Sequence, residues 1–391
     1  MFADEQGTCN ATVLTLHLHR IGVRPAAIAM RRTVTLTEAP TPAHAYNQAL
    51  DAARAMISAR EASLYSADGR PLLMSDALWL PTQRGTRPID VYVLRQGQLW
   101  VWPPRNLSVT IRDGTDGMDD GVVALRRRIE VLSRWPRVLR IRGLFSANEC
   151  AILRKAGKGR WQSSGSFDTA TGAHYSLTDG RRVSDTAWAG LHWGYVRDGV
   201  LTTPAIERLQ RRAADAARAH VGHAEPWQVV RYRAGGFQRH HLDGFRDDTL
   251  GGTARHVTVL AYLNDVDAEA SGGLTQFPYA HDDDPKFAFD PEGCTQGLSV
   301  APRRGDALIF YNAVEEESDG DGAENKPAED VTFGLDERAR HAACPLHSGE
   351  KYIANVWLHP TPVNEAIRRC APVEADAKRH HHCMRKEARA R

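Results

Sequence analysis

The sequence lacks the long apolar runs that would anchor a chain in a membrane. Its 391 residues contain no uninterrupted apolar stretch of about eighteen residues or more, the length that a membrane-spanning helix needs. The first residues, Met1-Phe-Ala-Asp-Glu, are acidic, and no continuous apolar segment typical of a secretory signal peptide follows them. We therefore expect no membrane span, and the missing signal peptide favours a cytoplasmic location.

An excess of one charge sign and a high cysteine density are also missing. The 50 Lys and Arg residues nearly balance the 48 Asp and Glu residues, so bulk charge offers no attraction to nucleic acid, and we expect no nucleic-acid partner. The six cysteines are scattered too widely for a disulfide scaffold, so free thiols are the expectation. They are Cys9, Cys150, Cys294, Cys344, Cys370 and Cys383.

Against this ordinary composition, one short motif supplies ligands for a metal ion. His241-Leu-Asp243 offers an imidazole and a carboxylate two residues apart, and side chains at that spacing point to the same side of a strand. His341 lies in a second strand-like stretch, Ala339 to Pro345, which could bring a third ligand if the two strands are adjacent. Two imidazoles and one carboxylate on one face of an octahedron suit ferrous iron and leave positions open for a co-substrate and dioxygen.

A His-x-Asp triplet alone is weakly specific, but here it belongs to an ordered series of motifs. The series contains Tyr232 to Asp243, Arg255 to Asn264, Gly272 to Pro278, Pro302 to Phe310, His341 to Pro345 and Gly349 to Trp357. With these motifs in this order, the chain resembles the iron(II) and 2-oxoglutarate-dependent dioxygenases, specifically the catalytic domain of collagen-type prolyl 4-hydroxylases. The resemblance runs from roughly Ile129 to Pro360.

The resemblance assigns roles to several polar residues. It implies three iron ligands: His241, Asp243 and His341. It also implies that Lys351 pairs with the distal carboxylate of 2-oxoglutarate, and an unpaired charge of either sign would be costly in an apolar barrel. Tyr232, nine residues before the first ligand, and Thr275 are expected to make further contacts with the co-substrate.

Other positions bear on the substrate. Arg255 matches the family position that helps to hold the peptide and its target proline, and Trp357 matches an aromatic residue near the substrate groove. Gln238 replaces the usual tyrosine three residues before the first ligand, and His240 replaces the usual proline. We place both departures on the substrate side of the pocket, where they leave the iron chemistry intact and leave the identity of the substrate open.

The implied reaction is hydroxylation of a peptidyl residue, with proline as the expected target, coupled to decarboxylation of 2-oxoglutarate to succinate. The implied cofactors are Fe(II), 2-oxoglutarate, O2 and ascorbate, and the implied partner is a proline-containing peptide or protein. Two alternatives stay open: an oxygenase acting on a non-prolyl side chain or small molecule, and a catalytically silent binding protein. Retention of the three ligands and Lys351 favours the enzyme, because their joint value is chemical.

Residues 1–104 form a separate compositional unit. Their pattern predicts strands over Val13 to Leu18 and Val34 to Leu36, a helix over Ala43 to Ile57, a strand entering a turn from Leu64, and a hairpin over Asp90 to Val101. This order resembles a ubiquitin-like β-grasp and, within that class, doublecortin-type modules. Two roles stay open for it: binding a protein partner, or packing on the catalytic barrel.

The expected fold class is therefore α+β, with a small β-grasp-like domain before a double-stranded β-helix, or jelly roll. We expect a linker over 105–128, the dioxygenase domain over 129–365 and a basic tail over 366–391 that includes the His380 to Cys383 tract. The Ser146-x-x-Glu149 capping box and Thr203-Pro204 predict two helices that buttress the jelly roll. An acidic insertion, Glu315 to Asp330, reads as a loop.

Overall fold

The computed structural model describes residues 13–22, 30–37, 41–79, 88–95, 98–112, 124–167, 174–175, 180–191, 200–247, 252–280, 294–315 and 333–363. Within these ranges the chain forms two compact units, one up to Pro103 and one from Pro104 onward. The linker expected over 105–128 was wrong in part, because residues 107–112 and 124–128 form strands of the second unit's large sheet, whereas the bounds of the dioxygenase domain and of the basic tail stay predictions. Residues 113–123, the acidic segment 316–332 and the tail from residue 364, with its histidine tract, lie outside the described residues.

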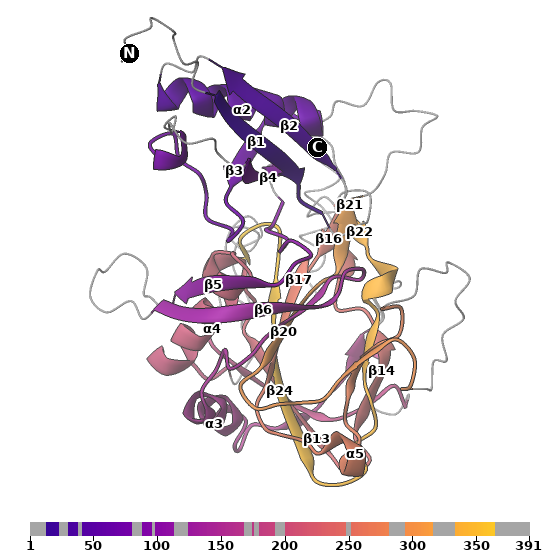
Figure 1. Cartoon of the computed structure of the whole chain (residues 1–391). Coiled ribbons are helices and arrows are strands. Elements are labelled where there is room, and N and C mark those ends of the chain that lie inside the picture. The colour runs from indigo at the N-terminus through magenta and orange to yellow at the C-terminus, as the bar shows by residue number, and fades with distance from the viewer. Residues whose placement is uncertain are drawn as a thin grey trace, which may run out of the picture. The chain divides into compact units, whose positions relative to one another are not determined.

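The first unit contains a mixed four-stranded sheet and helix α2 (Pro42–Ile57) (Figure 1). Its strand order is β2 (Arg31–Thr37), β1 (Val13–Arg20), β4 (Ile89–Arg95) and β3 (Ala62–Tyr65). Strand β1 runs antiparallel to β2 but parallel to β4, and β3 runs antiparallel to β4. A sheet with a parallel central pair and one covering helix is a β-grasp arrangement, as the sequence predicts.

Alternation along β1 explains how this unit forms its core. Leu16 and Leu18 are fully buried, whereas the alternating residues His17 and His19 are half-buried. The difference arises because successive side chains of a strand point to opposite faces. The helix presents one buried stripe to the same core: Ala45, Ala49, Ala53 and Ile57. The short helix η1 (Ala77–Trp79) adds the buried ring of Trp79.

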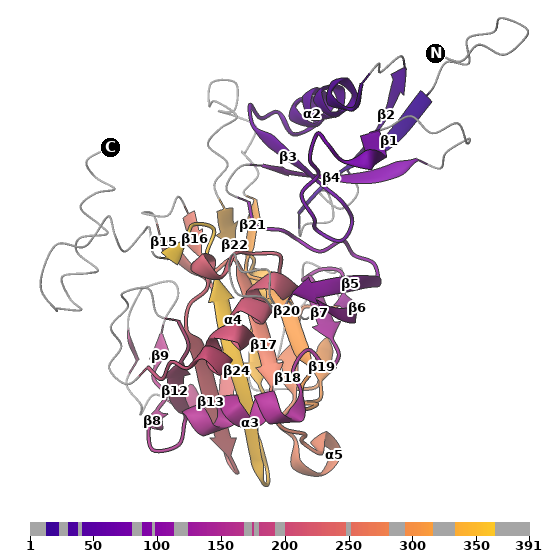
Figure 2. The ribbon, with the colours of Figure 1, turned by 90° about the vertical axis from the view of Figure 1, so that its left-hand side faces the viewer.

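The second unit contains two large antiparallel sheets (Figures 1 and 2). The nine-stranded sheet runs β5 (Leu107–Arg112), β6 (Ala124–Ser133), β7 (Val138–Ile141), β20 (Ala307–Tyr311), β17 (Val257–Tyr262), β24 (Glu350–Leu358), β13 (Trp227–Arg233), β12 (Asp185–Ala189) and β8 (Gln162–Ser163). The five-stranded sheet runs β11 (Arg182–Val183), β14 (Phe237–His241), β23 (His341–Ala343), β18 (Thr275–Phe277) and β19 (Leu298–Val300).

Three two-stranded ribbons and several short helices complete the described elements. The ribbons pair β9 (Ser166–Phe167) with β10 (His174–Tyr175), β15 (Phe245–Asp247) with β16 (Gly252–Ala254), and β21 (Ala313–Glu315) with β22 (Phe333–Leu335). The short helices are η2 (Val221–His223), α5 (Ala268–Ser271) and η5 (Glu337–Ala339). No helix in the part of the chain that the structure describes is long and apolar enough to cross a membrane.

Residues from both large sheets share one apolar core. Tyr232, Leu260 and Phe310 of the larger sheet pack in the same buried cluster as Phe277 and Ala343 of the smaller one. Strands β17 and β20 are buried at every position, which is typical of strands covered on both faces. Two facing antiparallel sheets with a shared core form the jelly roll that the sequence predicts.

Two helices lie across the larger sheet, where Figure 2 shows them in front of its strands. Helix α3 (Ala147–Ala156) begins with the complete capping box between Ser146 and Glu149, and α4 (Pro204–Ala216) begins after Thr203. Glu149 also accepts two hydrogen bonds from the buried Arg212 of α4, at 2.7 and 2.8 Å. The capping box thus fixes both the start of α3 and its packing against α4, which confirms the two expected helices.

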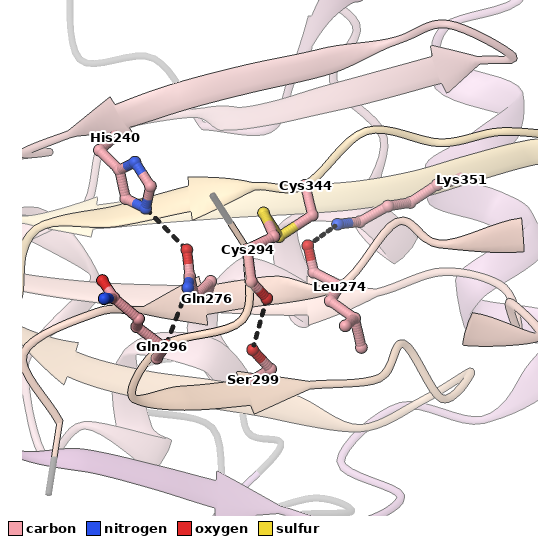
Figure 3. Close-up of a disulfide and its surroundings, with 8 residues drawn as sticks. All are labelled: His240, Leu274, Gln276, Cys294, Gln296, Ser299, Cys344 and Lys351. Atoms are coloured by element: carbon pink, nitrogen blue, oxygen red, sulfur yellow. Dashed lines mark hydrogen bonds between the residues drawn. A yellow bond between two sulfur atoms is a disulfide. The ribbon is translucent and has the colours of Figure 1, made fainter. Parts of the chain in front are cut away.

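The expectation of free thiols was wrong for two cysteines. Cys294 and Cys344 form a disulfide, with their Cα atoms 5.9 Å apart although 50 residues separate them in sequence (Figure 3). Cys294 precedes β19 and Cys344 follows β23, and both of these strands pair with β18. This pairing is invisible in the linear spacing of the cysteines. Cys150 is a buried free thiol.

Candidate functional site

The smaller sheet brings the three expected metal ligands together. His241 ends β14, His341 begins β23, and the two are cross-strand partners in the antiparallel pair. One donor atom from each of His241, Asp243 and His341 lies within 4.8 Å of the other two. The expectation that His241 and Asp243 share one strand was wrong, because β14 ends at His241 and Asp243 lies in the bend that follows.

Both imidazoles are oriented by hydrogen bonds on their far side. His241 Nδ1 lies 2.8 Å from the carbonyl oxygen of Arg239, and His341 Nδ1 lies 3.1 Å from that of Ala339. A carbonyl oxygen can only accept, so each Nδ1 carries the proton and each Nε2 keeps its lone pair. Those Nε2 atoms face Asp243, at 3.5 Å for His241 and 3.6 Å for His341. The site therefore presents two nitrogen lone pairs and one carboxylate to a common point.

Burial and local charge set the protonation of these ligands. Burial opposes the ionisation of Asp243, but the neighbouring imidazoles of His341 and His241 hold its pKa below the usual range. Burial lowers the pKa of His341 to about 4, so this imidazole is neutral at physiological pH. The Thr258 hydroxyl donates to Asp243 Oδ2 at 2.9 Å, and the Asn312 amide donates to Thr258 at 2.9 Å. Asp243 as a carboxylate and His341 as a neutral imidazole are thus in the states that bind metal.

A buried lysine lies near this group. Lys351 on β24 is 1% exposed and is the cross-strand partner of Tyr232 on β13. Its ammonium donates to the Leu274 carbonyl at 3.4 Å (Figure 3). It also lies 5.5 Å from the centre of the Tyr232 ring. Burial lowers the pKa of Lys351 to about 7, and no acidic group of the described residues offsets that effect. A buried cation without a counter-charge is costly, and a bound carboxylate would offset the cost.

Two buried hydroxyl groups belong to Tyr232, the cross-strand partner of Lys351, and to Thr275, which follows the Leu274 carbonyl that Lys351 contacts. Thr275 is 2% exposed, and its hydroxyl lies next to the buried hydroxyl of Tyr262. Tyr232 is also buried, and its hydroxyl lies 3.3 Å from the side-chain oxygen of Gln238. A carboxylate next to Lys351 could accept a hydrogen bond from the Tyr232 hydroxyl, because the Tyr232 ring centre lies 5.5 Å from the lysine ammonium. The donor set therefore fits a small dicarboxylic co-substrate as well as a metal ion.

Gln238 lies between the lysine pocket and the metal ligands, so its expected place on the substrate side was wrong. Its side-chain oxygen accepts from Tyr232, and its side-chain nitrogen donates to His241 Nε2 at 3.0 Å. Residues three apart point to opposite faces of a regular strand. Here the pairing of β14 with β23 shifts register between Gln238 and His241, and this β-bulge lets both side chains point the same way. A metal ion at His241 would have to replace the Gln238 hydrogen bond.

His240 belongs to a different contact. Its Nε2 atom lies 2.7 Å from the side-chain oxygen of Gln276 on β18, and the Gln276 amide donates to the Gln296 carbonyl at 2.8 Å (Figure 3). Gln296 follows the disulfide cysteine Cys294 by two residues. His240 thus joins β14 to the segment that the disulfide fastens.

Arg255 lies beside Asp243, but it is held in place by Glu225, which the sequence motifs did not indicate. Its guanidinium donates to both carboxylate oxygens of Glu225, at 2.6 and 2.9 Å, and stacks 3.8 Å from the centre of the Trp357 ring. His359 contacts the same carboxylate at 2.8 Å. His359 follows Trp357 by two residues, so strand alternation could have indicated it. Glu225 precedes β13, and no sequence signal marks it.

Comparisons with known proteins agree with this geometry. A model of the 2OG-Fe(II) oxygenase superfamily matches residues 227–359. Prolyl 4-hydroxylase subunit alpha-1 of Rattus norvegicus is 32% identical over 231 residues, which cover 57% of this chain and 34% of that relative. Probable prolyl 4-hydroxylase 3 of Arabidopsis thaliana is 32% identical over 235 residues, covering 59% of this chain and 71% of that relative. The chain belongs to the 2OG-Fe(II) oxygenase superfamily, within its prolyl 4-hydroxylases.

The matched length differs between relatives. The chain spans about a third of the length of the rat alpha-1 subunit that it matches. Among solved structures, the viral collagen prolyl hydroxylase of Paramecium bursaria Chlorella virus-1, in its 2OG complex, is 23% identical with a TM-score of 0.37. The match covers 57% of this chain and 95% of the viral one.

Proposed function

We propose that the chain is an Fe(II)- and 2-oxoglutarate-dependent hydroxylase of peptidyl proline. The observation that carries the proposal is the buried Lys351, which has no counter-charge among the described residues and is connected through Tyr232 and Gln238 to a set of two imidazoles and one carboxylate. A structural role gives no reason to bury a lone ammonium near three metal-binding donors. A dicarboxylic co-substrate that reaches the metal with one end and the lysine with the other accounts for both features.

Each of this chain's residues has a defined task in that reaction. His241, Asp243 and His341 would hold the iron, and Lys351 would bind the distal carboxylate of 2-oxoglutarate with help from the hydroxyls of Tyr232 and Thr275. When bound, iron and 2-oxoglutarate supply the oxidising power, with release of succinate and carbon dioxide. Ascorbate would serve as the reductant that keeps the iron ferrous. Aromatic contacts from Phe277 and Phe310 to the His341 ring would keep water from that ligand.

Proline is the favoured substrate residue because the relatives matched here are named prolyl 4-hydroxylases. Arg255 and Trp357 would form one wall of the peptide site, since the guanidinium is stacked on the indole ring and fixed by Glu225. Gln238 contacts Tyr232 and His241, so its departure from the family pattern bears on the metal and the co-substrate. The argument for a non-prolyl substrate then rests on His240 alone. A protein partner for the β-grasp unit is part of the same proposal.

The test measures succinate formed from 2-oxoglutarate by the full chain with Fe(II) and ascorbate, with and without proline-rich peptides. The reaction should be stimulated by the peptides and lost in His341→Ala, whereas His44→Gln, an exposed substitution in the first unit, should keep it. Turnover without peptide stimulation would retain the oxygenase but contradict proline as its substrate. Absence of both turnover and iron binding would contradict the enzyme and favour a binding protein.

A further inference from the structure

A second group of metal-binding side chains lies in the β-grasp unit. His17 and His19 are two residues apart on β1, so both point to the face of the sheet opposite the buried Leu16 and Leu18. Asp90 lies on β4, the parallel neighbour of β1, as the Cα partner of His17. All three side chains are half-buried, so they are ordered by the sheet yet accessible from solvent. The hydroxylase reaction uses none of them.

The donor atoms of this group already converge. Asp90 Oδ1 lies 2.7 Å from His19 Nε2 and 3.8 Å from His17 Nδ1, and one donor atom of each residue lies within 4.8 Å of the others. Zinc bonds of about 2.0 to 2.1 Å in a tetrahedron place ligand atoms roughly 3.4 Å apart. Small side-chain rotations would therefore bring the three donors around one ion without movement of the two strands.

Neighbouring contacts restrict the position of the rings. The His19 ring stacks on Tyr92 of β4, with ring centres 5.0 Å apart and planes at 19°. His17 and His19 meet edge to face, with ring centres 6.4 Å apart. Because part of the ring geometry is fixed before any ion arrives, less conformational freedom is lost on binding.

We propose that His17, His19 and Asp90 form a zinc site that joins β1 to β4. Two imidazole nitrogens and one carboxylate oxygen suit Zn2+ better than Mg2+ or Ca2+, which prefer sets made only of oxygen. Three protein ligands leave a fourth position for water or for a group from a partner. The two strands form the parallel pair at the centre of the sheet. A bound ion would therefore link segments that are separated by the whole α2 and β3 region.

The same contacts also suit a plain histidine and aspartate ion pair, so the experiment must separate the two. The full chain is titrated with ZnCl2 and dialysed. Elemental mass spectrometry then gives the number of zinc ions bound per chain. The iron ligands and the histidine tract of residues 380–382 can also bind zinc, so total stoichiometry alone is insufficient. Hydrogen exchange of amides in β1 and β4 supplies the local measurement.

We expect His19→Gln and His17→Gln each to bind one zinc ion fewer than the unmodified chain. At free zinc about a hundredfold above the dissociation constant, exchange that requires opening of the unit should slow roughly a hundredfold in β1 and β4. This slowing should be absent in both variants. It should persist in His44→Gln, which changes an exposed histidine of the same unit, and in His341→Ala, which removes an iron ligand of the other unit.

Asp90→Asn keeps the shape of the side chain and removes its charge, so it tests the site if a histidine variant fails to fold. It too should lose one zinc ion and the zinc-dependent slowing of exchange. If all three variants bind as much zinc as the unmodified chain and show the same exchange in β1 and β4, the group is an ion pair only and the proposal is overturned.

Discussion

Each unit of the molecule contains two imidazoles and one carboxylate within reach of a single ion, but the surroundings of the two groups differ. In the jelly roll, the side chains of Asp243 and His341 are each 6% exposed, and that of His241 is 25% exposed. In the β-grasp unit, the side chains of His19 and Asp90 are 22% and 33% exposed. The barrel group also lies near a buried lysine for which the described part of the chain supplies no counter-charge, whereas the sheet group faces solvent. The same donors can therefore serve redox chemistry in one place and a structural link in the other.

The comparison teaches that the ligand set alone does not define the chemistry. Fe(II) and Zn2+ both accept two nitrogens and one oxygen, so the ion is selected by coordination geometry, availability and the groups around it. What distinguishes the barrel is the buried Lys351 with the Tyr232 ring beside it, which fits a co-substrate that would complete the coordination of iron. The β-grasp group has no such pocket among its described contacts. The predictions below follow from this difference.

Loss of one barrel ligand should have the largest effect. His341→Ala removes a nitrogen donor, so turnover of 2-oxoglutarate should fall by more than the roughly 10- to 100-fold that loss of an outer-shell partner costs. Succinate formation and bound iron are measured in parallel, with His44→Gln as the control. A His341→Ala protein that keeps its iron and its turnover would contradict the assignment of the barrel group.

Removal of the buried ammonium should stabilise the protein in the absence of co-substrate. The pKa of Lys351 falls from 10.5 to about 7 in the folded chain, so the folded state binds this proton more weakly than the unfolded state does. The resulting penalty is absent above pH 10.5, grows as the pH falls and is complete below about pH 7, where it amounts to at most about 5 kcal/mol at 1.36 kcal/mol per pKa unit. Lys351→Met should raise the free energy of unfolding by up to that amount and lose 2-oxoglutarate binding.

The measurement for Lys351→Met is chemical denaturation near pH 6, together with calorimetric titration of 2-oxoglutarate. Lys155→Met, at the exposed end of α3, is the matched control and should change neither quantity much. A Lys351→Met protein that is less stable and still binds the co-substrate would show that Lys351 has a structural role instead.

Loss of the hydrogen bond from Thr258 to Asp243 should have an effect of intermediate size on iron binding. Thr258→Val removes the hydroxyl that donates to Asp243 Oδ2 and leaves the Asn312 amide without one of its two acceptors. We expect iron affinity to fall roughly 10- to 100-fold while the fold is retained. Equilibrium dialysis against Fe(II) without oxygen measures the affinity. Unchanged affinity would mean that the Thr258 hydroxyl does not orient the carboxylate.

The smallest expected effect is a pH dependence of co-substrate binding. Only the charged form of Lys351 attracts a carboxylate, and its pKa in the empty pocket is about 7. Affinity for 2-oxoglutarate should therefore fall roughly tenfold between about pH 6 and pH 8, with uptake of one proton on binding at the higher pH. Calorimetry in buffers with different ionisation enthalpies measures the proton. If the affinity does not change with pH and no proton is taken up, the pKa of Lys351 before 2-oxoglutarate binds is not near 7.

Local sequence patterns predicted most elements of both units, but the hairpin expected over Asp90 to Val101 was wrong, because only the strand β4 forms there and residues 98–101 are not in a strand. The Ser146 to Glu149 capping box and the apolar alternation of β1 each depend on neighbouring residues, so they are visible in the sequence. The ligand set could also be found, because ordered motifs with fixed spacing place His341 and Lys351 after His241. Register between distant strands could not be found in this way.

Three predictions were wrong because they depended on how strands that are distant in sequence pair or end. The bulge between Gln238 and His241 depends on how β14 pairs with β23, and it moved Gln238 to the co-substrate side of the pocket. The disulfide between Cys294 and Cys344 depends on two strands that share β18 as a neighbour. Asp243 lies beyond its strand because β14 ends two residues earlier than an unbroken pattern suggests. Contacts of this kind are set by tertiary packing.

The most direct test of the proposed barrel chemistry is the mass of a proline-containing peptide after incubation with the full chain, Fe(II), 2-oxoglutarate and ascorbate. We predict the gain of one oxygen atom on a proline residue, with one succinate formed per oxygen gained, and no gain in Lys351→Met. Iron-loaded protein that forms neither hydroxylated peptide nor succinate would contradict the proposal that Lys351 and the three ligands form an oxygenase site.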